Sequence, residues 1–330
     1  MDRPNKCGND AGGERKFMNA TTAKILQETG KVIAGKDDVL SKVLMAVLAG
    51  GHVLLEDVPG VGKTTLALAF HRALGLSYKR IQFTPDSMPS DIVGYTVYDR
   101  STNSFRYQPG AAMTHLLLAD EINRTSSRTQ SALLEVMEEG QATVDGETHL
   151  LPKPFIVLAT QNPVGAAGTQ ILPASQMDRF MIQLRMGYPN FQQQVRILKD
   201  RRTVNPLESV QTVVDREGVL KMQRALSALY IDDSVYEYVT SLSEATRTHP
   251  MVELGLSPRG ALAVCRMAQA CAYLASREYV VPDDVCAVFE EVCAHRLILN
   301  RKAVMSGADA RTVIGEILNT VEMPYASDWS

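Results

Sequence analysis

The chain has 330 residues, of which 45% are hydrophobic and 22% are charged, so its length suits about two domains and its composition is that of an ordinary globular protein. The formal net charge of −3 gives no general electrostatic attraction to nucleic acids or anionic membranes, and we expect no nucleic-acid partner. No apolar run approaches the roughly 18 residues that a membrane span requires, and the N-terminus has no hydrophobic signal core, so we expect a cytoplasmic protein without a membrane span.

The first part of the chain alternates between strand-like and helix-like patterns. Polar residues 1–18 predict a flexible tail, and residues 23–32 and 39–48 predict two helices. Short apolar runs typical of buried strands follow at 52–56, 78–83, 115–119, 155–160 and 181–186. Strands that alternate with helices indicate an α/β fold with a mostly parallel sheet covered on both faces.

A glycine-rich loop, "DVPGVGKT", joins the first strand to a helical pattern. It matches the phosphate-binding pattern G-x-x-x-x-G-K-[ST] except at its first position, where Asp57 replaces glycine at a strand end that tolerates many side chains. The glycines let backbone N–H groups face an anion, Lys63 can reach terminal phosphates and Thr64 can offer its hydroxyl to Mg²⁺. The helix N-terminus behind the loop also favours an anion. We therefore predict a working nucleotide site formed by Pro59, Gly60, Val61, Gly62, Lys63, Thr64 and Thr65.

Polar side chains follow two further strands. The strand at 115–119 leads to Asp120, which can hold Mg²⁺ through water, and to Glu121, which can orient and deprotonate an attacking water. The strand at 155–160 leads to Asn162, a neutral amide able to bind that water and the γ-phosphate. Taken alone, the Asn-Pro pair would mark only a turn. In series with the other strand ends, Asn162 is predicted to be a polar sensor at the same edge of the sheet.

Beyond residue 190, apolar residues recur at the spacing of helices, and no convincing strand appears. We predict a nucleotide-binding core at 19–189 and a helical second domain at 190–330. Ser257 is a good N-cap with proline directly after it, which places Arg259 in the first turn of a helix. Arg179, in "LPASQMDRF", would by composition alone be a surface ion-pair residue of little energetic weight.

Four segments together resemble the AAA+ ATPases, and more closely their MoxR branch: "EDVPGVGKTTLA", "LLLADEINRTSSRTQSALLEVMEEGQATVDGETHLLPKPFIVLATQNP", "LPASQMDRF" and "ATRTHPMVELGLSPRGAL". They occur in family order and span about residues 20–300. The resemblance implies an AAA+ P-loop core with a five-stranded parallel sheet, an all-helical lid, ATP and Mg²⁺ as cofactors, and assembly into a homo-oligomeric, hexameric ring. Many relatives have glycine where Asp57 stands and alanine where Gly62 stands.

The resemblance also implies a role for each candidate residue. Lys63 and Thr64 would belong to Walker A, and Asp120 and Glu121 to Walker B. Asn162 would be sensor 1. Arg259 would be sensor 2, coupling the γ-phosphate to the lid angle, and Arg179 would be an arginine finger that enters the neighbouring subunit's site.

Two inserts and a client are implied as well. Residues 93–110 resemble the insert within the second core helix, and residues 140–154 resemble the hairpin before sensor 1, with Asp145-Gly146 as its turn. MoxR relatives suggest chaperone-like remodelling or maturation of protein complexes, with a von Willebrand factor A domain protein as a partner. A helicase-like motor and a metal-chelatase subunit share the inserts and stay open as alternatives. A non-hydrolysing nucleotide-switch scaffold would normally lack Glu121 or Arg179.

Overall fold

The computed structural model describes residues 19–58, 60–162, 170, 172–200 and 205–324, so the predicted tail at 1–18 and Pro59 lie outside the described residues. Its centre is a five-stranded sheet in the order β2-β5-β8-β1-β9, with every neighbouring pair parallel. The strands run over these residues: β1 Val53–Glu56, β2 Tyr78–Gln82, β5 Leu116–Asp120, β8 Ile156–Gln161 and β9 Ile182–Leu184. The predicted parallel sheet is confirmed.

Alternating residues of the inner strands point into two hydrophobic clusters, one on each face of the sheet. The larger cluster includes Leu55, Leu118 and Leu158, together with side chains of the helices on that face. The smaller one includes Leu117 and Val157. Because both faces are covered, these strands carry continuous apolar runs, as their sequence pattern indicated.

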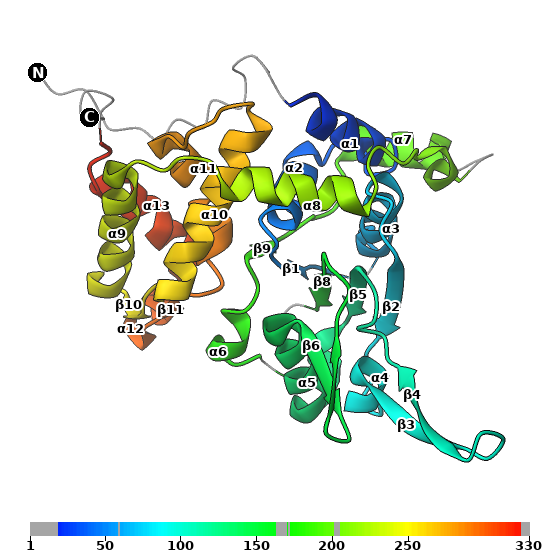
Figure 1. The fold of residues 1–330 in the computed structure, drawn as a ribbon. Coiled ribbons are helices and arrows are strands. Elements are labelled where there is room, and N and C mark those ends of the chain that lie inside the picture. Colours follow the sequence, from blue (N-terminus) through cyan, green and yellow to red (C-terminus); the bar gives the residue numbers. More distant parts are fainter. Residues whose placement is uncertain (1–18, 59, 163–169, 171, 201–204, 325–330) are drawn as a thin grey trace, which may run out of the picture.

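Helices cover the two faces unequally (Figure 1). The larger cluster is formed with α1 Ala20–Gly30, α2 Asp37–Leu48 and α3 Lys63–Ala73. Helices from the second half of the chain join it: α8 Arg216–Ser227, α9 Asp233–Thr248, α10 Pro258–Leu274, α11 Pro282–Cys293 and α13 Ala310–Thr320. The smaller cluster includes α4 Pro89–Val93 and α5 Ser127–Glu139. The described residues also form α6 Ala174–Met177, α7 Phe191–Asp200 and α12 Arg301–Met305, and two 3-10 helices at Ile122–Arg124 and Pro206–Ser209. No helix among the described residues has both the length and the apolar character to cross a membrane.

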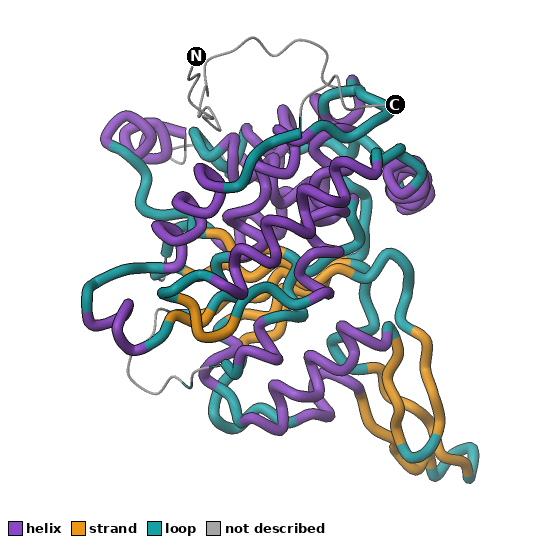
Figure 2. Tube along the Cα trace, turned by 90° about the vertical axis from the view of Figure 1, so that its left-hand side faces the viewer, coloured by secondary structure: helices purple, strands orange, loops and turns teal. Residues whose placement is uncertain are grey.

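Two antiparallel hairpins protrude on the side of α4 and α5 (Figure 2). The first joins β3 Gly94–Asp99 to β4 Ser104–Pro109, and the second joins β6 Gln141–Val144 to β7 Glu147–Leu150. These strands fall within the two segments predicted as inserts. The rings of Tyr107 and His149 stack between the hairpins, with centroids 3.7 Å apart and planes at 6°.

The helical second region contains one feature that the sequence did not indicate. Strands β10 Val252–Leu254 and β11 Ile298–Leu299 form a small antiparallel pair. The expectation of no strand beyond residue 190 was therefore wrong in this detail, because segments of 3 and 2 residues are too short to show periodicity. The predicted start of α10 is confirmed, since Ser257 caps it and Pro258 is its first residue.

Arg296 fastens the helical region to the segment before β9. Its side chain is only 3% exposed, and Nε donates to Asp178 Oδ1 over 2.7 Å. Its other nitrogens donate to the carbonyl oxygens of Phe180 at 2.7 Å and Met181 at 3.1 Å. Asp178 also accepts from the hydroxyl of Ser257, the cap of α10, at 3.0 Å. One buried guanidinium thus joins two regions that are more than a hundred residues apart in the chain.

Replacing Arg296 with alanine should lower the free energy of unfolding by on the order of 3 kcal/mol, because Asp178 loses its charged partner and the Met181 carbonyl loses the Arg296 donor. Urea denaturation measures this change. Arg311→Ala is the matched control, since its ion pair with Glu290 is about half exposed and should contribute below about 1 kcal/mol. Equal destabilisation by the two substitutions would show that Arg296 is not a structural link.

Candidate nucleotide-binding site

A cavity of about 590 Å³ lies beside the N-terminus of α3 and the carboxyl end of β5. One end is polar and is formed by the glycine-rich loop and by residues of β2 and β5. The other end is formed by the segment before α2 and by the chain that follows β9. The predicted residues that line the cavity are Gly60, Val61, Gly62, Lys63, Thr64, Thr65, Asp120 and Glu121.

The loop has the backbone shape that an anion cradle requires. Gly60 and Gly62 have φ angles of 88° and 103°, which side-chain-bearing residues rarely adopt. Gly62 is the N-cap of α3, so the first backbone N–H groups of this helix open toward the loop. Lys63 is 8% exposed, and its Nζ donates to the backbone oxygen of Asp57 at 2.7 Å. Desolvation lowers the pKa of Lys63, while the nearby carboxylates act in the opposite direction.

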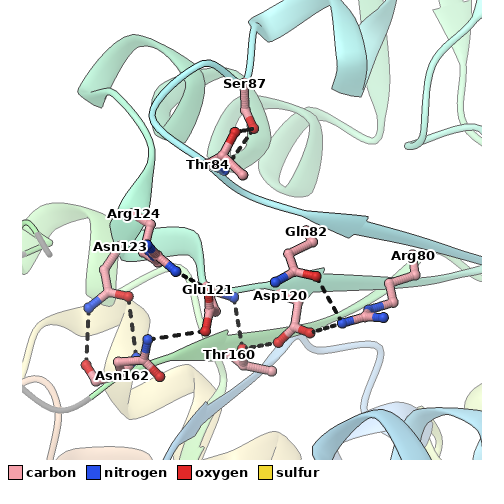
Figure 3. Close-up of polar contacts among 10 residues, drawn as sticks. All are labelled: Arg80, Gln82, Thr84, Ser87, Asp120, Glu121, Asn123, Arg124, Thr160 and Asn162. Atoms are coloured by element: carbon pink, nitrogen blue, oxygen red, sulfur yellow. Dashed lines mark hydrogen bonds and ion pairs between the residues drawn. The ribbon is translucent and has the colours of Figure 1, made fainter. Parts of the chain in front are cut away.

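Asp120 is enclosed by partners at the end of β5 (Figure 3). Its Oδ1 accepts from the Thr160 hydroxyl at 2.6 Å, and its Oδ2 accepts from Arg80 Nη2 at 2.7 Å. Asp120 is 8% exposed, and Arg80 and Gln82 of β2 line the same cavity. We did not predict Arg80. The only available signal was the polar residues at alternate positions of β2, which place Arg80 and Gln82 on one face of an edge strand.

Glu121 leaves the strand in a left-handed conformation, with φ 57° and ψ 48°. This turn lets Asp120 and Glu121 line the same cavity, although consecutive strand residues point to opposite faces. Glu121 Oε1 accepts from Asn162 Nδ2 at 3.3 Å, and Oε2 accepts from Arg124 Nη1 at 3.0 Å. Both carboxylate oxygens are therefore oriented by donors from other parts of the site (Figure 3).

Asn162 sits at the edge of this site rather than on the wall of the cavity. Its backbone N–H and C=O are both bonded to the side chain of Asn123, at 3.3 and 3.0 Å. Its side-chain Oδ1 is buried and has no hydrogen-bond partner among the described residues. Such an atom is expected to bind water or a ligand group. The glycine conformations, Lys63, the oxygen donors Thr64 and Asp120, and this Asn162 oxygen together fit a nucleotide with Mg²⁺.

Arg179 and Arg259 lie elsewhere, in a second cavity of about 460 Å³ that shares no lining residue with the first. Both bind Glu138 of α5: Arg179 Nε lies 2.7 Å from Oε2, and Arg259 contacts Oε1. These contacts lower the pKa of Glu138, with the hydrogen bond from Arg259 as the largest cause. The structure thus brings the two arginines together. It does not place Arg259 at the glycine loop of its own chain. The expected contact between Arg259 and a γ-phosphate bound to the same chain therefore has no support in this geometry.

Comparison with known proteins shows consistent similarity along the chain. The model of the ATPase family associated with various cellular activities (AAA) matches residues 52–182, and that of the AAA lid domain matches residues 244–317. YeaC, an uncharacterized protein of Bacillus subtilis, is 46% identical and covers 93% of this chain and 96% of its own length. Chaperone MoxR1 of Mycobacterium tuberculosis is 36% identical over 93% of this chain and 83% of its own length. A crystal structure from Cytophaga hutchinsonii, assigned as an ATPase, is 34% identical with a TM-score of 0.85, covering 92% of this chain and 96% of that one.

Arg80 and a divalent cation would compete for the Asp120 carboxylate, so Arg80→Gln should tighten cation binding. We expect about a fivefold lower dissociation constant for Mn²⁺ with saturating ADP, a modest factor because the Arg80 side chain is 41% exposed and its charge is screened. Electron paramagnetic resonance, which detects free Mn²⁺, measures this dissociation constant. Arg124→Gln removes the same charge from an equally exposed residue that contacts Glu121 instead, and it should change the constant less. Equal effects of both variants would contradict the direct competition.

Proposed function

The chain belongs to the MoxR family of AAA+ ATPases, and from this we propose that it is an ATP-hydrolysing motor that remodels or matures client protein complexes. The observation that carries the proposal is the convergence of Lys63, Asp120 and Glu121 on one cavity next to two glycines in left-handed conformations. The chaperone activity named for a relative suggests the kind of work that the motor performs. The cytoplasmic location and a von Willebrand factor A domain partner stay predictions.

Each residue of the cavity has a proposed part in hydrolysis. The N–H groups of the glycine loop and Lys63 would bind the triphosphate, while Thr64 and Asp120 would hold Mg²⁺, which neutralises phosphate charge when bound. Glu121 would accept the proton of the water that attacks the γ-phosphorus, giving ADP and phosphate. The contacts of Asn162 and Arg124 with both Glu121 oxygens support this role, because they fix the direction of the base.

Arg179 would complete the site of a neighbouring subunit in a ring, which the family suggests is hexameric. Its contact with Glu138, in a cavity separate from the glycine loop of its own chain, supports a role outside its own site. Arg259 binds the same carboxylate, so we propose that it acts on the neighbouring site together with Arg179. Two guanidinium groups there would stabilise the charge that develops on the transferred phosphoryl group.

Lys63→Ala and Glu121→Gln should separate nucleotide binding from hydrolysis. Lys63→Ala should weaken ATP binding, because it removes a charge from the phosphate end of the cavity. Glu121→Gln should retain ATP affinity and reduce turnover by about 10²-fold or more, because only the activation of water is lost. Equilibrium binding and steady-state turnover check both, with exposed Glu237→Gln on α9 as the control. Turnover by Glu121→Gln at the control rate would remove Glu121 from the role of base.

Mixing inactive variants should test whether the arginines act between subunits. Lys63→Ala subunits lack their own site yet still donate both arginines, whereas Arg179→Ala subunits keep the glycine loop. Each variant alone should be inactive, and mixtures should regain part of the turnover, because some interfaces pair an intact loop with an intact arginine. Arg259→Ala mixed with Lys63→Ala should behave in the same way.

ATP turnover against mixing ratio is the measurement, and native mass spectrometry verifies that mixed rings form. Turnover near zero at every ratio, in rings shown to be mixed, would place the tested arginine in the site of its own subunit. The two arginines are tested separately, so one can fail while the other holds.

A further inference from the structure

Asp57, the residue that departs from the glycine-loop pattern, has a buried carboxylate with specific partners. It directly follows β1 and is 8% exposed. Its Oδ2 accepts from the backbone N–H of Gly187 at 3.0 Å and from that of Met186 at closer range. Both donors follow β9 on the chain that leads toward α7, and Gly187 has a φ of 62°. The carboxylate therefore fixes the path by which the chain leaves the sheet.

Together with the segment before α2, the chain held in this way forms the part of the first cavity wall that the phosphate loop and the strands do not form. Tyr188 and Pro189 follow Gly187 and line the cavity together with Val32 and Ile33. Two more hydrogen bonds join these facing segments. Lys36 Nζ donates to the Tyr188 carbonyl at 3.2 Å, and Gln193 Nε2 donates to the Gly35 carbonyl at 2.9 Å. Apolar side chains and backbone carbonyls make this end suitable for a nucleotide base.

Asp57 also contacts the phosphate end of the cavity, through its backbone oxygen and Lys63 Nζ. One residue thus contacts both ends. A neighbouring link exists, since Arg185 Nη2 donates to Glu56 Oε2 at 2.6 Å, but the Arg185 side chain is 61% exposed. The Glu56 side chain is only 10% exposed but also accepts from Gln183 Nε2 at 3.2 Å, and neither Glu56 nor Arg185 lines the cavity. The hydrogen bonds of Asp57 are the more protected of the two links, and a charged acceptor strengthens them.

We propose that Asp57 is a positioning residue that builds the base end of the nucleotide cavity. By holding the Met186–Gly187 backbone, its side chain places Tyr188 and Pro189 against the segment before α2. A glycine at position 57 would satisfy the loop pattern but could not form this link. The inference rests on the proposed function, because it assumes that the cavity binds a nucleotide with its phosphates at the glycine loop.

Two ligands separate the two ends of the cavity: ADP, and tripolyphosphate, which has phosphates but no base. Asp57→Gly should weaken ADP binding about tenfold, because the N–H groups of Met186 and Gly187 lose their acceptor and the base end loosens. It should change tripolyphosphate binding less than about twofold. Asp57→Asn should stay within about threefold of the original chain for ADP, since both N–H groups bind a single oxygen and an amide oxygen can replace it. Isothermal titration calorimetry measures all of these constants.

Arg185→Gln is the matched control, because it breaks the neighbouring link at residues that do not line the cavity, and it should bind both ligands as the original chain does. An equal loss of ADP and tripolyphosphate binding in Asp57→Gly would overturn the inference, since Asp57 would then merely shape the loop. Unchanged ADP binding would overturn it too. If Asp57→Gly does not fold, Asp57→Asn takes its place in the test. A tenfold loss of ADP affinity in folded Asp57→Asn would also overturn the inference, because its amide oxygen can still accept both hydrogen bonds. Failure of the original chain to bind either ligand would instead contradict the proposed function.

Discussion

The burial of three parallel strands on both faces determines where polar chemistry can lie in this protein. Strands β1, β5 and β8 are buried along their whole lengths, and an uncompensated charge within them would be very costly. Polar groups are tolerated only where the strands end. The register pairs Gln82 with Asp120 and Glu56 with Gln161, so these ends meet at one edge. The resulting carboxylates still need partners, and Thr160, Arg80 and Arg124 supply them.

The same sheet supports the helical region as part of one core. The larger hydrophobic cluster runs without interruption from Val53 and Leu118 to Val264 of α10 and Val288 of α11. Arg296 adds a polar link at the edge of that cluster, to the segment that carries Asp178 and Arg179. The packing that places α10 also sets the position of Arg259 in its first turn. The packing of α10 and the hydrogen bonds of Arg296 to Asp178 therefore bring Arg259 and Arg179 to the same carboxylate, that of Glu138.

The sequence predicts the features that depend on the pattern of apolar residues along a short segment. It does not predict those that depend on contacts between segments far apart in the chain. The continuous apolar run at 115–119 predicted β5 within one residue at each end, because burial on both faces leaves a strong signal. Asp120 and Glu121 were identifiable because they follow such a run. The Arg80–Asp120 pair was not, since no local pattern reveals which strands become neighbours. For the same reason, the place of Arg259 beside Arg179 and the hydrogen bonds of the Asp57 carboxylate could not be predicted.

The stacked rings of Tyr107 and His149 connect two hairpins that lie far apart in the sequence. Besides the route from β3 through α4 to β2, the covalent routes back to the sheet pass along β5, reached from β4, and along α5 and β8, which flank β6 and β7. These are the elements that end near Asp120, Glu138 and Asn162. A shift of either hairpin would therefore be passed along continuous strands and one helix to the positions where these three polar side chains lie.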